Sequence, residues 1–215
     1  MRIRVYILLV LILALVAPPL AAQAPADSAK SREHQIKAAF SYNFIKFVDW
    51  PKEEMADSNE PITIGIIGPK DFIKAFEPVI HKKIRGRNIS MKYFAGYEKL
   101  KRSQEPDDRQ WDKKMETLKS CQLLMFCRRD SKRIENSSQI IKALKGSPIL
   151  TIGEEGDFLK SGGVINFVTE GKRVRFEINV AAAKENKLKV SSKLLRLAKK
   201  VVGKKSPQQA RIQVR

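Results

Sequence analysis

The chain has 215 residues, with 42 Lys and Arg against 23 Asp and Glu, which gives a formal charge of +19. A content of 43% hydrophobic and 30% charged residues is that of a globular domain, and it excludes disordered, collagenous and disulfide-dense proteins. Two cysteines and two histidines argue against a tetrahedral zinc cluster, because a structural site needs four converging ligands. The excess of positive charge predicts an anionic partner or surface without naming the anion.

Residues 1–24 have the layout of a secretory signal peptide. Two arginines precede an uninterrupted apolar run of 13 residues, 5–17, and small residues lead to cleavage points after Ala22 or Ala24. The alternative is an uncleaved membrane anchor, but a helix of that length spans only about 20 Å of the roughly 30 Å hydrocarbon core. The sequence therefore predicts that the protein is exported and that residues 1–24 are removed.

The mature chain is expected to have three parts: a short disordered lead (25–32), one domain (33–202) and a basic disordered tail (203–215). Removal of residues 1–24 leaves a charge of +17, of which residues 184–215 contribute +10. Such a basic end suits an acidic protein or the headgroups of a membrane surface. Export argues against nucleic acid, and no nucleic-acid-binding motif accompanies the charge.

The first two thirds of the domain predict alternating helices and strands. Apolar spacing of 4, 4 and 3 from Ile36 to Phe47 indicates an amphipathic helix, which ends at Trp50-Pro51 because the residue before a proline is pushed out of the α region. The β-branched run 62–67 predicts a strand buried on both faces. After it we expect a helix capped by Asp71, strand 89–94, a short helix ending near Leu118, strand 121–126, helix 131–145 and strand 148–152.

A β-hairpin is predicted in the last third of the domain. Residues 164–168 and 173–178 alternate between polar and apolar side chains, and the residues that join them include Gly171. Alternation gives the hairpin one face that is more polar than the other, whereas the first strand is predicted to be buried on both faces. The last predicted element is a helix over about 191–201.

Together these elements predict an α/β fold in a single domain. We expect a mixed, mostly parallel sheet of about six strands, with helices on both faces and the hairpin in the C-terminal half.

The sequence contains no recognisable catalytic or nucleotide-binding motif: no G-x-S-x-G elbow, no P-loop, and no G-x-G-x-x-G after the first strand. The acidic group at 154–157 fits a metal or acid–base role less well than a solvated turn. No cofactor and no metal ion is therefore predicted, and the protein is not expected to be an enzyme.

Cys121 and Cys127 are not expected to form a disulfide. If both lie on one strand they are about 20 Å apart, whereas a disulfide needs Cα atoms within about 7 Å. Cys121 is expected to be buried. Cys127 is expected to be more exposed, at a strand end beside Arg128 and Arg129, where positive charge would favour its thiolate.

The most suggestive polar group lies in the hairpin, where Asn166, Arg175, Glu177 and Asn179 are predicted to share a face. The planar guanidinium of Arg175 suits a carboxylate or a phosphate. The alternative is a solvated face on which Arg175 and Glu177 pair with each other or across the strands.

Three segments together resemble the YfiR family of small exported bacterial proteins. The first runs from 37 to 51 with the pattern K-A-A-F-x-Y-N-F-x-K-F-x-x-W-P, and the second joins the strand 62–66 to C-Q-L-L-M-F at 121–126. The third covers 158–198 and is the most specific, with G-G-V-I-N-F, R-V-R-F-E-I-N and V-S-S-K-L-L-R-L-A. Their order and spacing extend the resemblance over residues 33–201.

The resemblance implies a periplasmic, non-enzymatic regulator. The typifying member represses a membrane-bound diguanylate cyclase through its periplasmic sensing region, and an outer-membrane-associated partner relieves that repression. Other members serve other membrane receptors, including histidine kinases. The family fold, a sheet between helices, agrees with the fold predicted above. This sequence has no further cysteine that could pair with Cys121, so control through a disulfide does not carry over.

The leading interpretation is a periplasmic regulator that binds the periplasmic part of an inner-membrane receptor of the diguanylate cyclase type and represses or tunes its output in cyclic-di-GMP signalling. An outer-membrane-associated protein is a second expected partner, and a homodimer is left open. The alternative function is a periplasmic module that binds a small anionic ligand near Arg175. The candidate polar contacts are Asn166, Arg175, Glu177 and Asn179, and the candidate apolar anchors are Tyr42 and Trp50.

Overall fold

The computed structural model describes residues 26–51, 60–100, 108–128 and 136–203. The predicted signal peptide, the predicted tail beyond Gly203 and the start of the predicted helix 131–145 lie outside these residues. Contacts divide the chain after Ser31, and the domain described below begins at Arg32. None of the helices in the described residues is long and apolar enough to cross a membrane.

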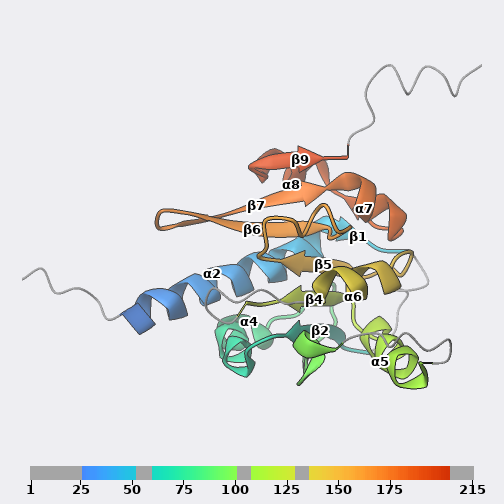
Figure 1. The fold of residues 1–215 in the computed structure, drawn as a ribbon. Helices are drawn as coiled ribbons and strands as arrows, with labels where there is room; N and C mark the ends of the chain where they lie inside the picture. The colour runs from blue at the N-terminus through green and yellow to red at the C-terminus, as the bar shows by residue number, and fades with distance from the viewer. Residues whose placement is uncertain (1–25, 52–59, 101–107, 129–135, 204–215) are drawn as a thin grey trace, which may run out of the picture. The chain divides into compact units, whose positions relative to one another are not determined.

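A seven-stranded sheet in the order β3-β2-β4-β5-β6-β7-β9 forms the centre of the domain (Figure 1). Neighbours from β3 to β6 are parallel, β6 and β7 are antiparallel, and β9 is parallel to β7. The predicted α/β class with a mostly parallel sheet is therefore confirmed, with one strand more than expected. The strands are β2 (Ile62–Ile67), β3 (Ile89–Tyr93), β4 (Leu123–Phe126), β5 (Leu150–Gly153), β6 (Ile165–Glu170), β7 (Arg173–Asn179) and β9 (Lys200–Val202), and a separate ribbon pairs β1 (Val48–Asp49) with β8 (Lys189–Val190).

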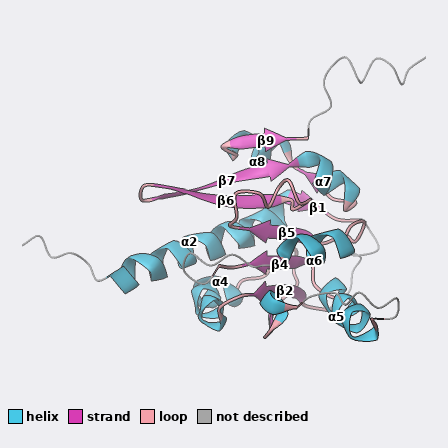
Figure 2. Ribbon diagram, in the orientation of Figure 1, coloured by secondary structure: helices cyan, strands magenta, loops and turns pink. Residues whose placement is uncertain are grey.

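Helices cover both faces of this sheet, as predicted (Figure 2). On one face, α2 (Ala26–Phe47), the 3₁₀ helix η1 (Lys70–Phe76) and α4 (Glu77–Ile80) pack into an apolar layer, called here the α2 layer. On the other face, α5 (Arg109–Lys119) and α6 (Ser137–Ala143) form the α6 layer. The short helix α8 (Ser192–Leu197) buries Leu194 in the α2 layer, α7 (Val180–Glu185) follows β7, and η2 (Tyr97–Lys99) follows β3.

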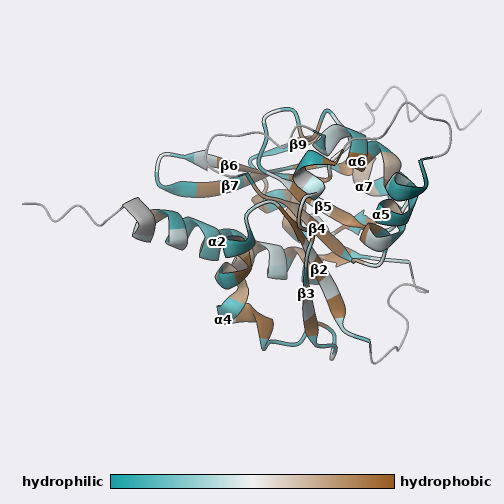
Figure 3. Ribbon diagram, turned by 60° about the horizontal axis from the view of Figure 1, so that its bottom comes forward, coloured by the Kyte–Doolittle hydropathy of each residue, from teal (hydrophilic) through white to brown (hydrophobic). Residues whose placement is uncertain are grey.

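The strands are apolar because both of their faces are covered, and Figure 3 shows apolar residues gathered along the central strands. Every residue of β2 is buried, as its β-branched run predicted. Trp111, isolated among polar residues in the sequence, is also buried, because it points from α5 into the α6 layer. Asp108 begins that helix by accepting a hydrogen bond from the backbone N–H of Trp111.

Two predicted helices are divided in the structure. After β2 the chain forms η1 and then α4, and Asp71 does not cap η1, because Pro69 occupies the N-cap position. Pro78 falls in the first turn of α4, where its missing N–H costs no helical hydrogen bond. The helix predicted over 191–201 ends at Leu197, and β9 follows it. There the β-branched Val201 and Val202 pair with β7, so sheet pairing prevails over helical spacing.

Two boundaries also differ from the prediction. The first helix begins at Ala26, so residues 26–32 are helical and not a disordered lead. The hairpin turn has two residues and not four, because β6 and β7 pair up to Glu170 and Arg173. Gly171 adopts a φ of 58° in this turn, a conformation that glycine accepts without steric cost.

Candidate functional site

The four candidate residues of the hairpin lie on one face of the sheet, as predicted. Phe167 and Phe176 face each other across β6 and β7 and contact aromatic rings of α2. Side chains alternate along a strand, so the neighbouring positions point to the opposite side. There Asn166 pairs with Glu177 and Val168 with Arg175. We call this side of β6 and β7, with Asn166, Arg175, Glu177 and Asn179, the hairpin face.

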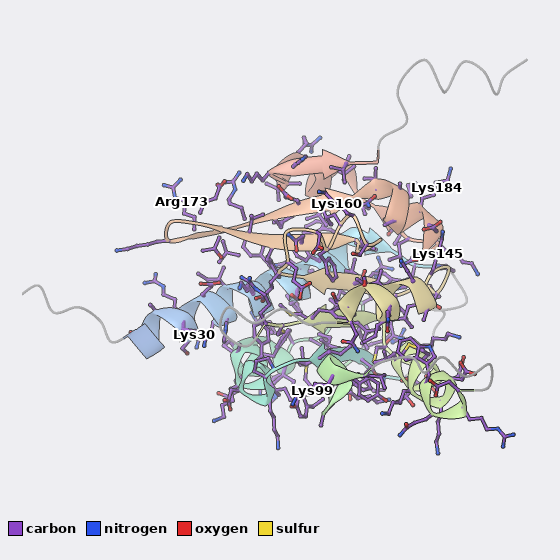
Figure 4. All side chains as sticks on the ribbon, in the orientation of Figure 1. Lys30, Lys99, Lys145, Lys160, Arg173 and Lys184 are labelled. Carbon is purple, nitrogen blue, oxygen red and sulfur yellow. The ribbon has the colours of Figure 1, made fainter. Side chains whose placement is uncertain are left out.

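Within the described residues, no helix of the α6 layer covers the hairpin face. Figure 2 shows α6 over β4 and β5. Among the described residues, the apolar cluster beneath α5 and α6 contains no residue of β6, β7 or β9. Arg175 is accordingly exposed and Glu177 half-buried. Figure 4 shows Arg173 at the tip of the same hairpin, with its side chain extending into solvent.

Charged side chains from two elements meet beside Arg175. Lys199, just before β9, forms an ion pair with Glu170 at 2.5 Å. The hydrogen bond and charge of Lys199, and to a smaller extent the charge of Arg175, lower the pKa of Glu170. Between Arg175 and Glu177 the structure shows no ion pair in the described residues. The Arg175 guanidinium is therefore available to an external carboxylate or phosphate.

Asn166 is the buried member of the hairpin face, with 3% of its surface exposed. Its side-chain oxygen Oδ1 has no hydrogen-bond partner in the described residues. A buried amide oxygen without a partner costs free energy, so it is a candidate acceptor for a group that is absent from the isolated chain.

Asn179 has a structural role in the fold. It is the N-cap of α7, where its Oδ1 accepts a hydrogen bond from the backbone N–H of Ala182 at 3.0 Å. Its Nδ2 donates to the carbonyl of Leu159, also at 3.0 Å. Both ends of the amide are engaged, so Asn179 has less to offer a partner than Arg175.

The two aromatic candidates lie away from the hairpin face. Tyr42 is half-buried on α2, and its hydroxyl donates to the carbonyl of Lys83 at 3.3 Å. Trp50 is only 7% exposed, belongs to the α2 layer, and donates through Nε1 to the carbonyl of Pro148 at 2.9 Å. The indole of Trp50 therefore has little surface left for a partner.

A second polar group lies at the carboxyl ends of the parallel strands, where open α/β sheets commonly bind ligands. Lys37 of α2 is buried there, and its Nζ is 2.6 Å from Glu33 and 3.2 Å from Glu154, the residue that follows β5. Thr169 of β6 donates a hydrogen bond to the same Glu33 carboxylate. The lysine thus fills the edge of the sheet and ties α2 to β5 and β6.

Burial and charge act in opposite directions on the two carboxyl groups of this cluster. Burial raises the pKa of Glu154 above its usual range, although the charge and hydrogen bond of Lys37 oppose the shift. Burial also acts to raise the pKa of the less buried Glu33, but the Lys37 hydrogen bond and charge outweigh it and lower that pKa. Oε1 of Glu154 is buried and has no hydrogen-bond partner among the described residues.

Sequence reasoning missed this cluster. The sequence favours a solvated turn for the acidic group 154–157, but Glu154 contacts Lys37 and Glu155 is buried, accepting a hydrogen bond from Ser137. One signal could have found the lysine: Lys37, Ser41 and Phe44 follow the 4-3 spacing of one helix face, and all three are buried. The partner of a lysine on a buried stripe has to be acidic or a carbonyl group.

Both cysteines are buried and unpaired. Burial raises the pKa of Cys121 to about 11. The expectation of a more exposed Cys127 with a favoured thiolate is wrong: burial and the charge of Glu154 raise its pKa well above the usual value. The chain folds Cys127 beneath α2, so burial, and not the charge of the neighbouring arginines, sets the ionisation of its thiol.

Within the described residues there is also no group of three His, Cys, Asp or Glu side chains placed to hold a metal ion.

The chain is similar to one protein family and to several solved structures. A family model described as YfiR/HmsC-like (DUF4154) matches residues 34–199. Among solved structures, an ABC domain from Streptococcus pneumonia in complex with L-Trp superimposes with a TM-score of 0.51 at 12% identity, over 77% of this chain and 60% of that one. A conserved domain protein from Vibrio cholerae gives a TM-score of 0.49 at 8% identity, over 79% of this chain and 60% of that one.

The structural similarity to the streptococcal domain shows the fold alone, because the identity is low. This chain spans 60% of each of those two solved chains. No protein with a curated description matches the sequence. The family match, in contrast, covers nearly all of the domain and includes the hairpin face and the buried Lys37 with its partner Glu154. The chain belongs to the YfiR/HmsC-like family.

Proposed function

We propose that this protein is an exported regulator that binds the periplasmic part of an inner-membrane signalling receptor of the diguanylate cyclase type and represses or tunes its output. Family membership supports this proposal, because YfiR-like proteins are regulators and not enzymes. The hairpin face is the contact surface in this proposal, with Arg175 and Glu177 as its polar contacts.

The observation that carries the proposal is the open polar face of β7. Arg175 is exposed, sits on a strand of a well-packed sheet and forms no ion pair with a described residue. Its planar guanidinium can bind a carboxylate through two parallel hydrogen bonds, which fixes the orientation of a partner. A rigid strand also places this group with less loss of conformational entropy than a loop would.

The energy that such a regulator must supply is modest. A differential affinity of about 3 kcal/mol for two receptor states shifts their ratio by roughly 150-fold. One charged contact at the centre of an interface, with the hydrogen bonds around it, supplies free energy on this scale.

Crosslinking in intact cells tests the proposal. We expect the wild-type protein to capture an inner-membrane cyclase or kinase that has a periplasmic domain. Arg175→Ala should lower that capture at least about tenfold, a loss typical of an arginine at an interface centre. Arg196→Ala is the matched control, because Arg196 is exposed on α8, which packs in the other layer.

The two parts of the proposal can fail separately. If the wild-type protein captures no inner-membrane receptor, the regulatory function is wrong. If Arg175→Ala stays within twofold of wild type while the protein remains folded, the hairpin face is not the contact. A rise in melting temperature with an added anion such as inorganic phosphate, lost in Arg175→Ala, would instead favour the ligand-binding alternative.

A further inference from the structure

The surface around the C-terminal half of α2 carries positive charge that no described carboxylate neutralises at its centre. The ammonium groups of Lys46 and Lys82 lie 5.3 and 5.8 Å from the centre of the same Tyr42 ring. Neither lysine forms an ion pair with a carboxylate in the described parts of the chain. Two cations are therefore held at one aromatic ring, where the π face attracts each of them while they repel each other.

The ring that holds them is fixed to the fold. The Tyr42 hydroxyl donates to the carbonyl of Lys83 in the loop after α4. That bond links α2 to the loop carrying Lys82, so the two lysines come together because two elements pack and not because one flexible segment folds back. Both lysines are exposed.

The basic surface continues toward the β1–β8 ribbon. The guanidinium of Arg85 donates to the carbonyl of Val48 and to the carboxylate of Asp49. Asp49 lies opposite the exposed Lys189 in the ribbon. We call this surface the Tyr42 patch, and define it by Tyr42, Lys46, Lys82, Arg85 and Lys189; among the described residues the acid that these contacts include is Asp49.

The chemistry of the patch suits a membrane better than a protein partner. Lysine is depleted in the cores of protein–protein interfaces, which need desolvated aromatic or arginine anchors. Here Arg85 is already paired and Tyr42 is half-buried, and in the described residues the one large, strongly exposed hydrophobic side chain is Leu197 of α8, outside the patch. Flexible, hydrated lysines around a tyrosine match the diffuse negative charge of lipid headgroups instead.

We propose that the Tyr42 patch binds the anionic headgroup surface of a phospholipid membrane. Each basic side chain near such a surface adds about 1 kcal/mol to the attraction. Lys46, Lys82 and Lys189 form no ion pair with a described residue, so the patch supplies a weak and reversible contact. The contact is electrostatic, so it weakens as salt shortens the screening length. It goes beyond the proposed function, because it concerns a lipid surface and not a receptor.

Vesicle sedimentation with the full chain tests this proposal. We expect the protein to bind phosphatidylcholine vesicles that contain phosphatidylglycerol more tightly than pure phosphatidylcholine vesicles, and the difference to disappear at high salt. Lys46→Glu/Lys82→Glu should weaken binding to the anionic vesicles at least about tenfold. Arg2, Arg4 and the apolar run 5–17 are the same in the wild type and in every variant, so their contribution cancels when the variants are compared.

A matched variant separates the patch from net charge. Lys113→Glu/Lys142→Glu makes the same change of charge on α5 and α6, in the other layer, at two exposed lysines. This control should stay within about threefold of wild type, because charges more than about 10 Å from the bound surface are screened. Far-ultraviolet circular dichroism and melting temperature show that both variants are folded.

Three outcomes would overturn the proposal. Equal losses in the two double variants would show that net charge alone drives binding. Equal binding of the wild type to anionic and neutral vesicles would show that no anionic surface is recognised. Loss of receptor crosslinking in Lys46→Glu/Lys82→Glu, without any loss of vesicle binding, would assign the patch to an acidic protein segment.

Discussion

Phe158 shows how tightly single residues are fixed beside the hairpin face. Its ring lies over Gly153 at the end of β5 and Gly163 just before β6, and a methyl group at either glycine would overlap the ring. The ring also packs against Phe126 of β4. Glycine is therefore needed at both positions for close approach of an aromatic ring, and neither has a positive φ.

Substitution of these glycines should destabilise the domain. We expect Gly163→Ala to lower the free energy of unfolding by about 1–3 kcal/mol, because the buried Phe158 must leave its position. Gly156→Ala in the same loop is the control, since a methyl group at Gly156 would meet nothing within 4 Å, and its effect should stay within about 0.5 kcal/mol. Urea denaturation of both variants measures the difference. Equal effects would mean that the loop adjusts and that Phe158 does not hold it.

Glu154 makes stability depend on pH in the direction opposite to an ordinary ion pair. Its pKa in the folded protein is raised above the ordinary value of 4.5, mainly by burial. The unfolded chain therefore releases this proton at lower pH than the folded protein does. The contribution of Glu154 to the free energy of unfolding is fully present below the pKa that this group has in the unfolded chain. It is lost as pH rises through the pKa that the group has in the folded protein.

Glu154→Gln should accordingly gain stability relative to wild type between pH 4 and pH 7, because glutamine stays neutral in both states. Urea denaturation at the two pH values gives the comparison. Glu116→Gln is the control, since Glu116 forms an exposed pair with Lys119 on α5 and should show a difference within about 0.5 kcal/mol at both pH values. The opposite result, a wild type that becomes more stable relative to Glu154→Gln as pH rises, would contradict this expectation. It would show that the attraction of Lys37 for the Glu154 carboxylate exceeds the free-energy cost of burying that carboxylate.

At the scale of elements, the junction of β7 and α7 separates structural from contact residues. Asn179 caps α7 and also bonds to the loop after β5, whereas Arg175, four residues earlier on the same face, is exposed. Asn179→Ala should lose about 0.5–2 kcal/mol of stability, the usual value for an N-cap. Arg175→Ala should change stability by less than about 0.5 kcal/mol. Thermal unfolding of the two variants checks this, and a stable Asn179→Ala would mean that water replaces the cap.

Sequence reasoning found the elements that are determined by the spacing of apolar and polar residues within one segment of the chain. The shared face of Asn166, Arg175 and Glu177 follows from alternation in two strands joined by a tight turn, so it needs no knowledge of the rest of the fold. Strand β9 is different. Val201 continues the apolar stripe of the preceding helix, and only the free edge of β7 makes residues 200–202 a strand.

At the scale of the whole molecule, the part that local spacing could not predict is the contact between α2 and the carboxyl edge of the sheet. Lys37 and Glu154 meet because α2 packs over the sheet with Glu33 and Lys37 at the carboxyl ends of β5 and β6, and this packing does not follow from the sequence of either segment. The same packing explains Cys127. Its sequence neighbours are arginines, but its spatial neighbours are buried residues of α2 and β5.

The two thiols offer a measurement on the whole domain, because they lie in different layers. Cys121 packs in the α6 layer and Cys127 in the α2 layer, and their exposed fractions are 2% and 1%. Their pKa values are raised by burial, so each is also poorly ionised at neutral pH. Reaction of either thiol therefore requires opening of the layer that covers it.

We expect neither cysteine to react with a thiol reagent within minutes in native buffer at pH 8, and both to react at once in denaturant. If the sheet and its two layers unfold as one unit, the two labelling rates should rise together with urea, and peptide mass spectrometry assigns each rate to its cysteine. Rapid native labelling of Cys127 alone would show that α2 detaches from the sheet before the α6 layer opens. Disulfide-linked dimers on a non-reducing gel would contradict the burial of both thiols.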